Sequence, residues 1–161
     1  MVEPFVELYS DSGNRSRVTS TYSDLSEISN TRYDRIVSIA TFEHLCELPA
    51  IVAQCGLLLA DCGQLRVAIP SEGTILWTLG WKLTTGVEFR LRHGLDYSVL
   101  MKHEHVNTAK EIAGVLGVFF GSVRRSVFGI SPALSFYQFF KCVAPDRKRC
   151  SDYLSSRDLI R

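Results

Sequence analysis

The segment Tyr33-Asp34-Arg35-Ile36-Val37-Ser38-Ile39-Ala40-Thr41-Phe42-Glu43-His44-Leu45 combines a short apolar run with an abrupt polar ending. The run is rich in β-branched residues and almost unbroken, which is typical of a strand buried on both faces of a parallel sheet. We therefore expect a central strand. Thr41, Glu43 and His44 follow it at once, and open α/β sheets bind ligands at such strand ends. A ligand site is expected there.

A helix and a second strand follow this segment. Leu48-Pro49 begins the helix, because proline suits a first helical turn. Asp61-Cys62-Gly63 is expected to end it in a turn, where Gly63 is able to take positive φ. Leu65 to Ile69 then forms the second strand, and a strand-helix-strand unit of this kind crosses over right-handed.

In order and spacing, these segments resemble the class I S-adenosylmethionine-dependent methyltransferases, in particular the small-molecule group of ubiquinone and menaquinone biosynthesis enzymes. Residues 33–38 with 42–45 look like the family's fourth strand and the motif after it. Leu65 to Pro70 matches its fifth strand, although the usual Pro-Gly-Gly turn reads Asp61-Cys62-Gly63 here. The likeness covers roughly residues 1–143. It implies an α/β, Rossmann-like fold with a mostly parallel sheet, helices on both faces and a C-terminal antiparallel hairpin.

The resemblance also implies a cofactor site. Glu3 stands where the family accepts hydrogen bonds from the ribose hydroxyls of the cofactor. Asp24 would accept from the adenine amino group, with Leu25 against the ring, while Ala40 and Thr41 would line the same site. Each acidic residue has a second interpretation. Glu3 also fits a solvated carboxylate near a helix N-terminus, and Asp24, at the exit of a short strand expected over residues 18–22, fits a cap of the next backbone segment.

One part of the family pattern is absent from this sequence. The first strand and its Gly-rich loop would precede Met1, and no Gly-x-Gly sequence occurs elsewhere. Relative to the family we therefore expect an N-terminally truncated domain. Without a first strand, two strand edges are exposed, and self-association through them is expected.

Residues 72–107 form an insertion rich in aromatic and basic residues, longer than an ordinary connection, which we interpret as a lid over the acceptor. Histidine titrates near neutrality and suits a catalytic base. His44 is the first candidate, with His105 and Tyr97 as weaker ones, although His44 also fits a helix-start residue bonded to the backbone. His103 and His105 alone are too few ligands for a metal site, so no metal is expected.

The C-terminal part contains one more helix and two strands. Thr108-Ala109-Lys110-Glu111 is a capping box that begins a helix to about Phe119. Val123 to Phe128 and Leu134 to Val143 are expected to form the antiparallel hairpin, with Pro132 in its connection. Residues 144–161 are highly charged, and we expect them to form an exposed tail, for which a helix is also considered.

Composition indicates a single globular domain and argues against nucleic-acid binding, membrane spans and secretion. With 161 residues, 46% hydrophobic and 22% charged, the chain has the size of one globular domain. A formal net charge of +1 implies no nucleic-acid partner, and no apolar run approaches the ~20 residues of a membrane span. The five cysteines contain no Cys-x-x-Cys pair, and the N-terminus is no secretory signal. A reduced, cytoplasmic protein is expected.

The function implied by the resemblance is transfer of a methyl group from S-adenosyl-L-methionine to a small-molecule acceptor. The alternative is a non-catalytic or truncated methyltransferase-like fragment, or an interaction module without cofactor binding. A nicotinamide-binding domain is disfavoured, because it needs the same kind of Gly-rich turn that this sequence does not contain.

Overall fold

The structure of the protein is a computed structural model, which describes residues 20, 22–28, 31–71, 79–80, 83, 87–88, 91–92, 106–132 and 134–158. The chain divides into two units, Met1–Thr31 and Arg32–Arg161. In the first unit the described part contains the 3-10 helix η2 (Leu25–Glu27). Most of the expected insertion lies outside the described residues, as does most of the short strand expected over residues 18–22.

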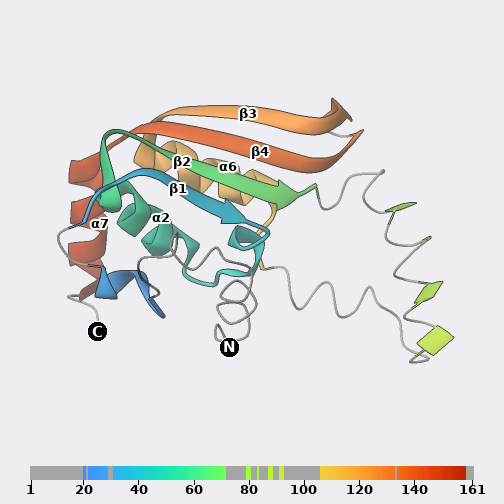
Figure 1. The fold of residues 1–161 in the computed structure, drawn as a ribbon, viewed down its shortest axis with the longest axis horizontal. Coiled ribbons are helices and arrows are strands. Elements are labelled where there is room, and N and C mark those ends of the chain that lie inside the picture. Colours follow the sequence, from blue (N-terminus) through green and yellow to red (C-terminus); the bar gives the residue numbers. More distant parts are fainter. Residues whose placement is uncertain are drawn as a thin grey trace. The chain divides into compact units, whose positions relative to one another are not determined.

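The second unit contains a four-stranded sheet in the order β1-β2-β4-β3 (Figure 1). Its elements follow in the order β1 (Tyr33–Ile39), η3 (Phe42–His44), α2 (Leu48–Leu58), β2 (Leu59–Pro70), α6 (Ala109–Phe119), β3 (Phe120–Ser131), β4 (Leu134–Pro145) and α7 (Arg147–Asp158). Strands β1 and β2 are parallel, whereas β4 is antiparallel to both β2 and β3. The hairpin is thus confirmed, but a mostly parallel sheet is wrong, because β4 enters between β2 and β3 in the opposite direction.

Strand β1 does not occupy the expected central position. Within the described part of the chain it pairs with β2 and with no strand on its other side, so it forms an edge of the sheet. Val37 is 55% exposed and Ile39 is 65% exposed, although their β-branched side chains suit burial. The apolar run therefore predicted the strand correctly but not its neighbours.

The two faces of the sheet differ in cover. Along β2, Leu65, Val67 and Ile69 are at most 1% exposed, since α2 and α6 cover the face to which these residues point (Figure 1). Successive residues of a strand point to opposite faces. The opposite face, here called the open face, carries Val37, Ile39, Arg66, Ala68, Phe139 and Lys141. No described helix covers it, so the expectation of helices on both faces is wrong for this part of the chain.

The join between α2 and β2 also differs from the expectation. The helix ends at Leu58 and the strand begins at Leu59, without an intervening turn. The pairing with β1 passes from Tyr33–Leu59 to Arg35–Gln64, so β2 bulges between these pairs. A Cβ atom on Gly63 would lie 2.8 Å from the carbonyl oxygen of Tyr33. Gly63 is not among the described residues with positive φ. Glycine is needed there because the backbone of Tyr33 comes too close for a side chain.

The helices of the C-terminal part are held by specific hydrogen bonds. The predicted capping box is confirmed, with Thr108 and Glu111 bonded to each other's backbone at the start of α6. The charged residues after β4 form α7, which packs on the core, whereas we expected an exposed tail. Arg147 donates to the carbonyl oxygen of Leu59 at 2.8 Å, and Cys150 is fully buried. Among the described helices, none is long and apolar enough to cross a bilayer.

Candidate functional site

The carboxyl end of β1 has an unusual backbone conformation. Ala40 has a φ of 48°, in the left-handed region, and its amide donates to the carbonyl oxygen of Ala68 at 2.8 Å. Thr41 Oγ1 donates to the carbonyl oxygen of Ile39 at 2.9 Å. Such a conformation costs roughly 1–3 kcal/mol in a non-glycine residue and recurs at binding sites. Ala144 shares it at the end of β4, where Asp146 and Arg147 follow, so the conformation alone does not mark a binding site.

The loop after β1 is tied to the segment that precedes α6. The carbonyl oxygen of Glu43 accepts from the amides of Val106 at 2.9 Å and Asn107 at 3.1 Å. Asn107 Nδ2 donates to the carbonyl oxygens of Phe42 at 2.9 Å and Leu45 at 2.6 Å. Residues distant in the sequence therefore hold η3 in one position at the strand end.

Replacing the Asn107 side chain tests this attachment. We expect Asn107→Ala to lower the free energy of unfolding by about 1–3 kcal/mol, because two partly buried carbonyl oxygens lose their donor. Urea denaturation followed by circular dichroism measures the change. Ser122→Ala, at an exposed position of β3, is expected to stay within about 0.5 kcal/mol of the parent. Equal stability of the two variants would contradict the structural role of Asn107.

Glu43 is the residue that sequence reasoning missed. It is 2% exposed, and its Oε2 atom has no hydrogen-bond partner among the described residues. Burial raises the pKa of this carboxyl above its ordinary value, because a charge is poorly solvated there. The sequence signal for this burial was the position of Glu43 in a short segment flanked by the apolar residues Phe42 and Leu45. A buried carboxylate with a raised pKa at a strand end is a candidate proton acceptor.

His44 lies beside Glu43 in η3. Its amide donates to the carbonyl oxygen of Thr41 at 3.0 Å, which is the backbone bonding expected of a helix-start residue. Its side chain is 41% exposed, and Nε2 lies 4.0 Å from Glu43 Oε1. The two side chains thus combine one group that is open to solvent with one that is buried.

The other candidates fall into two groups. In the first unit, Asp24 caps η2, and its Oδ1 accepts from the amide of Ser26 at 2.7 Å. Hydrogen bonds from the Ser26 side chain and from its amide lower the pKa of Asp24, which agrees with the capping interpretation. Leu25 is half-buried at the start of the same helix. The remaining candidates, Glu3, Tyr97 and His105, lie outside the described residues, and their roles stay predictions.

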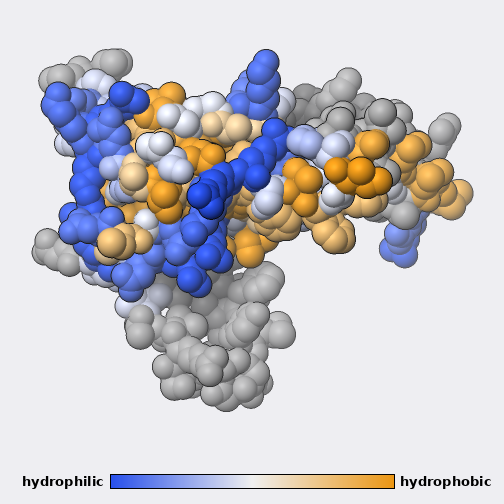
Figure 2. Space-filling model, turned by 90° about the horizontal axis from the view of Figure 1, so that it is seen from above, coloured by the Kyte–Doolittle hydropathy of each residue, from blue (hydrophilic) through white to orange (hydrophobic). Residues whose placement is uncertain are grey.

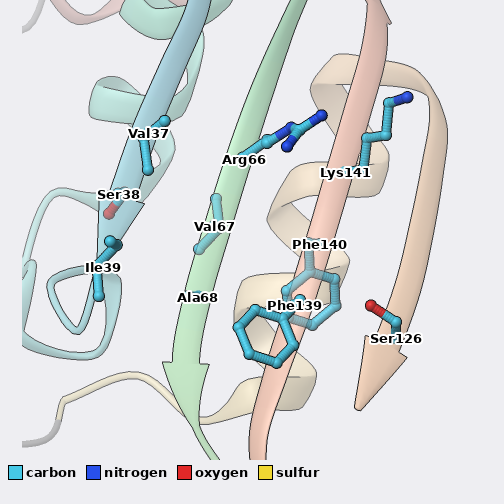
Figure 3. Close-up of a pocket in the computed structure, with 10 residues that line it drawn as sticks. All are labelled: Val37, Ser38, Ile39, Arg66, Val67, Ala68, Ser126, Phe139, Phe140 and Lys141. Carbon is cyan, nitrogen blue, oxygen red and sulfur yellow. The ribbon is translucent and has the colours of Figure 1, made fainter. Parts of the chain in front are cut away.

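A separate hollow of about 410 Å³ lies on the open face. Figure 3 shows the ring of Phe139 and the side chain of Ile39 on either side of Ala68, with Arg66 and Lys141 toward one end. This hollow could not be predicted from the sequence, because residues from all four strands line it and only the pairing of the sheet brings those strands together. Its lining is mainly apolar with two cationic groups.

Known proteins resemble this chain in fold but not in sequence. No family model and no curated protein matches it. Among solved structures, an O-methyltransferase family protein from Burkholderia thailandensis matches 86% of this chain with a TM-score of 0.51 and 12% sequence identity. The chain has a methyltransferase-like fold. At this identity the likeness concerns the fold alone and selects no particular group of methyltransferases. The chain spans 39% of that protein's length.

Proposed function

We propose that this chain belongs to a methyltransferase that transfers the methyl group of S-adenosyl-L-methionine to a small-molecule acceptor. The observation that carries the proposal is the buried carboxyl of Glu43 just after β1, whose Oε2 has no hydrogen-bond partner among the described residues. Ligands of open α/β sheets bind at such ends. The methyltransferase-like fold supports the same assignment.

In this proposal the cofactor supplies an activated methyl group on a sulfonium centre. Ala40 and Thr41 would line its site, and the carboxylates of Glu3 and Asp24 would accept hydrogen bonds from its ribose and adenine, with Leu25 against the ring. Carboxylates suit these roles because both cofactor groups are hydrogen-bond donors. Together these residues would hold the adenosine end of the cofactor.

The protein's own contribution is to hold the acceptor in line with the methyl group, which is worth ~7–11 kcal/mol at best. When bound, S-adenosyl-L-methionine would supply its methyl group to an acceptor oxygen or nitrogen and would leave as S-adenosylhomocysteine. The acceptor proton passes to His44 or to ionised Glu43, with Tyr97 and His105 as weaker candidates. A base with a pKa near the working pH is favourable for this step.

Calorimetric titration with S-adenosylhomocysteine, the demethylated product, tests the cofactor site. We expect micromolar affinity, about −8 kcal/mol. Glu3→Ala should weaken binding by roughly 1.5–3 kcal/mol, as for hydrogen bonds to a charged group. A folded sample that releases no heat and shows no binding by equilibrium dialysis would rule the proposal out for this chain.

Substitution of His44 separates catalysis from cofactor binding. We expect His44→Ala to lower turnover of an identified acceptor about 100-fold or more, because general-base catalysis contributes about that much. Affinity for S-adenosylhomocysteine should stay unchanged. Unaltered turnover across pH 6 to 9 would instead assign His44 only its backbone role in η3.

A second candidate function is an interaction module without catalysis. The open face supports it, because exposed apolar and cationic side chains lie together there. We also propose a reducing compartment such as the cytoplasm, since all five cysteines are free. Self-association through the free edge of β1 belongs to this second candidate as well.

A further inference from the structure

The open face exposes large apolar side chains of a kind that is usually buried. Exposed hydrophobic residues lie next to hydrophilic ones on the surface seen in Figure 2. On the open face Val37 and Ile39 are more than half exposed, and Phe139 is 41% exposed. Parallel strands are normally covered on both faces. The parallel pair of β1 and β2 is covered on one face by helices, whereas no described helix covers the apolar surface on the other face.

Three cations cross the same face in one row. Arg66 of β2 lies opposite Lys141 of β4, which lies opposite Arg124 of β3. Like charges directly opposite each other destabilise a sheet. Arg66 Nε donates to the uncharged Gln64 Oε1, and none of the three forms an ion pair with a described carboxylate. The row therefore favours a binding partner that brings negative charge.

The hollow adds a shape requirement to the charge requirement. Its floor contains the small residue Ala68, and Ile39 and Phe139 rise beside it (Figure 3). Arg66 and Lys141 stand at one end of this apolar trough. If a large apolar side chain of a partner entered the hollow, the partner residues next to it would lie close to the row of cations. Apolar anchors flanked by acidic residues have this arrangement on an amphipathic helix.

We propose that the open face binds an acidic amphipathic helix of another protein. Its apolar stripe packs on Ile39, Ala68 and Phe139, and its carboxylates pair with the row of Arg66, Lys141 and Arg124. A helix suits the site because helices are the layers that cover sheets in α/β proteins. This inference develops the interaction-module function and does not depend on methyl transfer.

Other occupants fit the face less well. A second copy of the chain would bring a second row of cations against the first, without described carboxylates on the face to compensate. Single-stranded nucleic acid would satisfy the cations, but it binds by stacking on aromatic rings. At the hollow, Val37 and Ile39 are aliphatic, and the exposed ring is that of Phe139 alone among the lining residues.

The test is a fluorescence-anisotropy titration of the full chain with a labelled peptide of about 18 residues, or about five helical turns. The peptide has leucines at helical spacing and glutamates beside them, and a second peptide has lysine for each glutamate. We expect micromolar binding of the acidic peptide and at least about tenfold weaker binding of the basic one. Arg66→Glu/Lys141→Glu should reverse this preference.

A matched control makes the same change in net charge at two positions away from the open face. Arg125→Glu/Lys148→Glu alters the covered-face side of β3 and an exposed residue of α7, and should keep the preference for the acidic peptide. If the first double variant does not fold, Arg124→Glu should still weaken acidic-peptide binding several-fold.

Equal binding of both peptides would overturn the proposal. So would tighter binding of an oligouridylate of about twelve nucleotides, or a dimer in light scattering that Ile39→Glu converts to monomer. Binding of S-adenosylhomocysteine is measured separately, so the methyltransferase proposal stands or falls independently.

Discussion

Ile69→Ala is expected to lower the free energy of unfolding by about 2–5 kcal/mol, whereas Ile39→Ala should lower it by less than about 1 kcal/mol. The two residues are of the same type and lie on neighbouring parallel strands. Ile69 is 1% exposed beneath the helices, so its truncation leaves a cavity in a close-packed core. Ile39 is 65% exposed on the open face, so its truncation leaves no cavity. Urea denaturation of both variants measures the difference.

The comparison also tests whether the open face is uncovered in solution. Loss of β-branching alone costs at most about 1 kcal/mol in a strand and affects both variants. A cost of several kcal/mol at Ile39 would mean that this side chain is buried in the solution state. The peptide-binding surface proposed above would then not be available.

Glu43→Gln is expected to stabilise the protein at neutral pH by about 1–3 kcal/mol, because the neutral amide avoids the cost of burying a charged carboxylate. Burial raises the pKa of Glu43 in the folded state above its ordinary value of 4.5. The folded protein therefore binds more protons than the unfolded chain as pH rises from 4.5 to the folded-state pKa. Stability of the parent falls over that window, and the full penalty is present above it.

Thermal unfolding across pH checks this prediction. The variant should match the parent below pH 4.5, where Glu43 is protonated in both states, and should exceed it at pH 7. The expected gain in Tm is about 2–4 °C per kcal/mol for a chain of this size. Glu27→Gln, at an exposed carboxyl, should show no pH-dependent gain. A constant difference at all pH values would show that the charge of Glu43 is not its cause. A stabilising variant that loses turnover would mark Glu43 as a residue kept for function.

The local elements were readable in the sequence. Four predicted features rest on interactions between residues close in the chain. They are the apolar run of β1, the proline in the first turn of α2, the Thr108–Glu111 capping box and the hairpin of β3 and β4. For the same reason the strand end after Ile39 was recognisable as a polar site. The roles of Glu3, Tyr97 and His105 stay predictions, because no described contact bears on them.

The neighbours of each element were decided by the tertiary structure. An apolar run predicts a strand suited to burial, but long-range pairing placed β1 at an edge and β4 between β2 and β3. The row of Arg66, Lys141 and Arg124 exists only because two registers align residues that are distant in sequence. Likewise, Glu43 is an ordinary acidic residue in the sequence, and its raised pKa arises from packing. Sequence periodicity records which side chains share a face, whereas burial and charge depend on what the folded chain brings against that face.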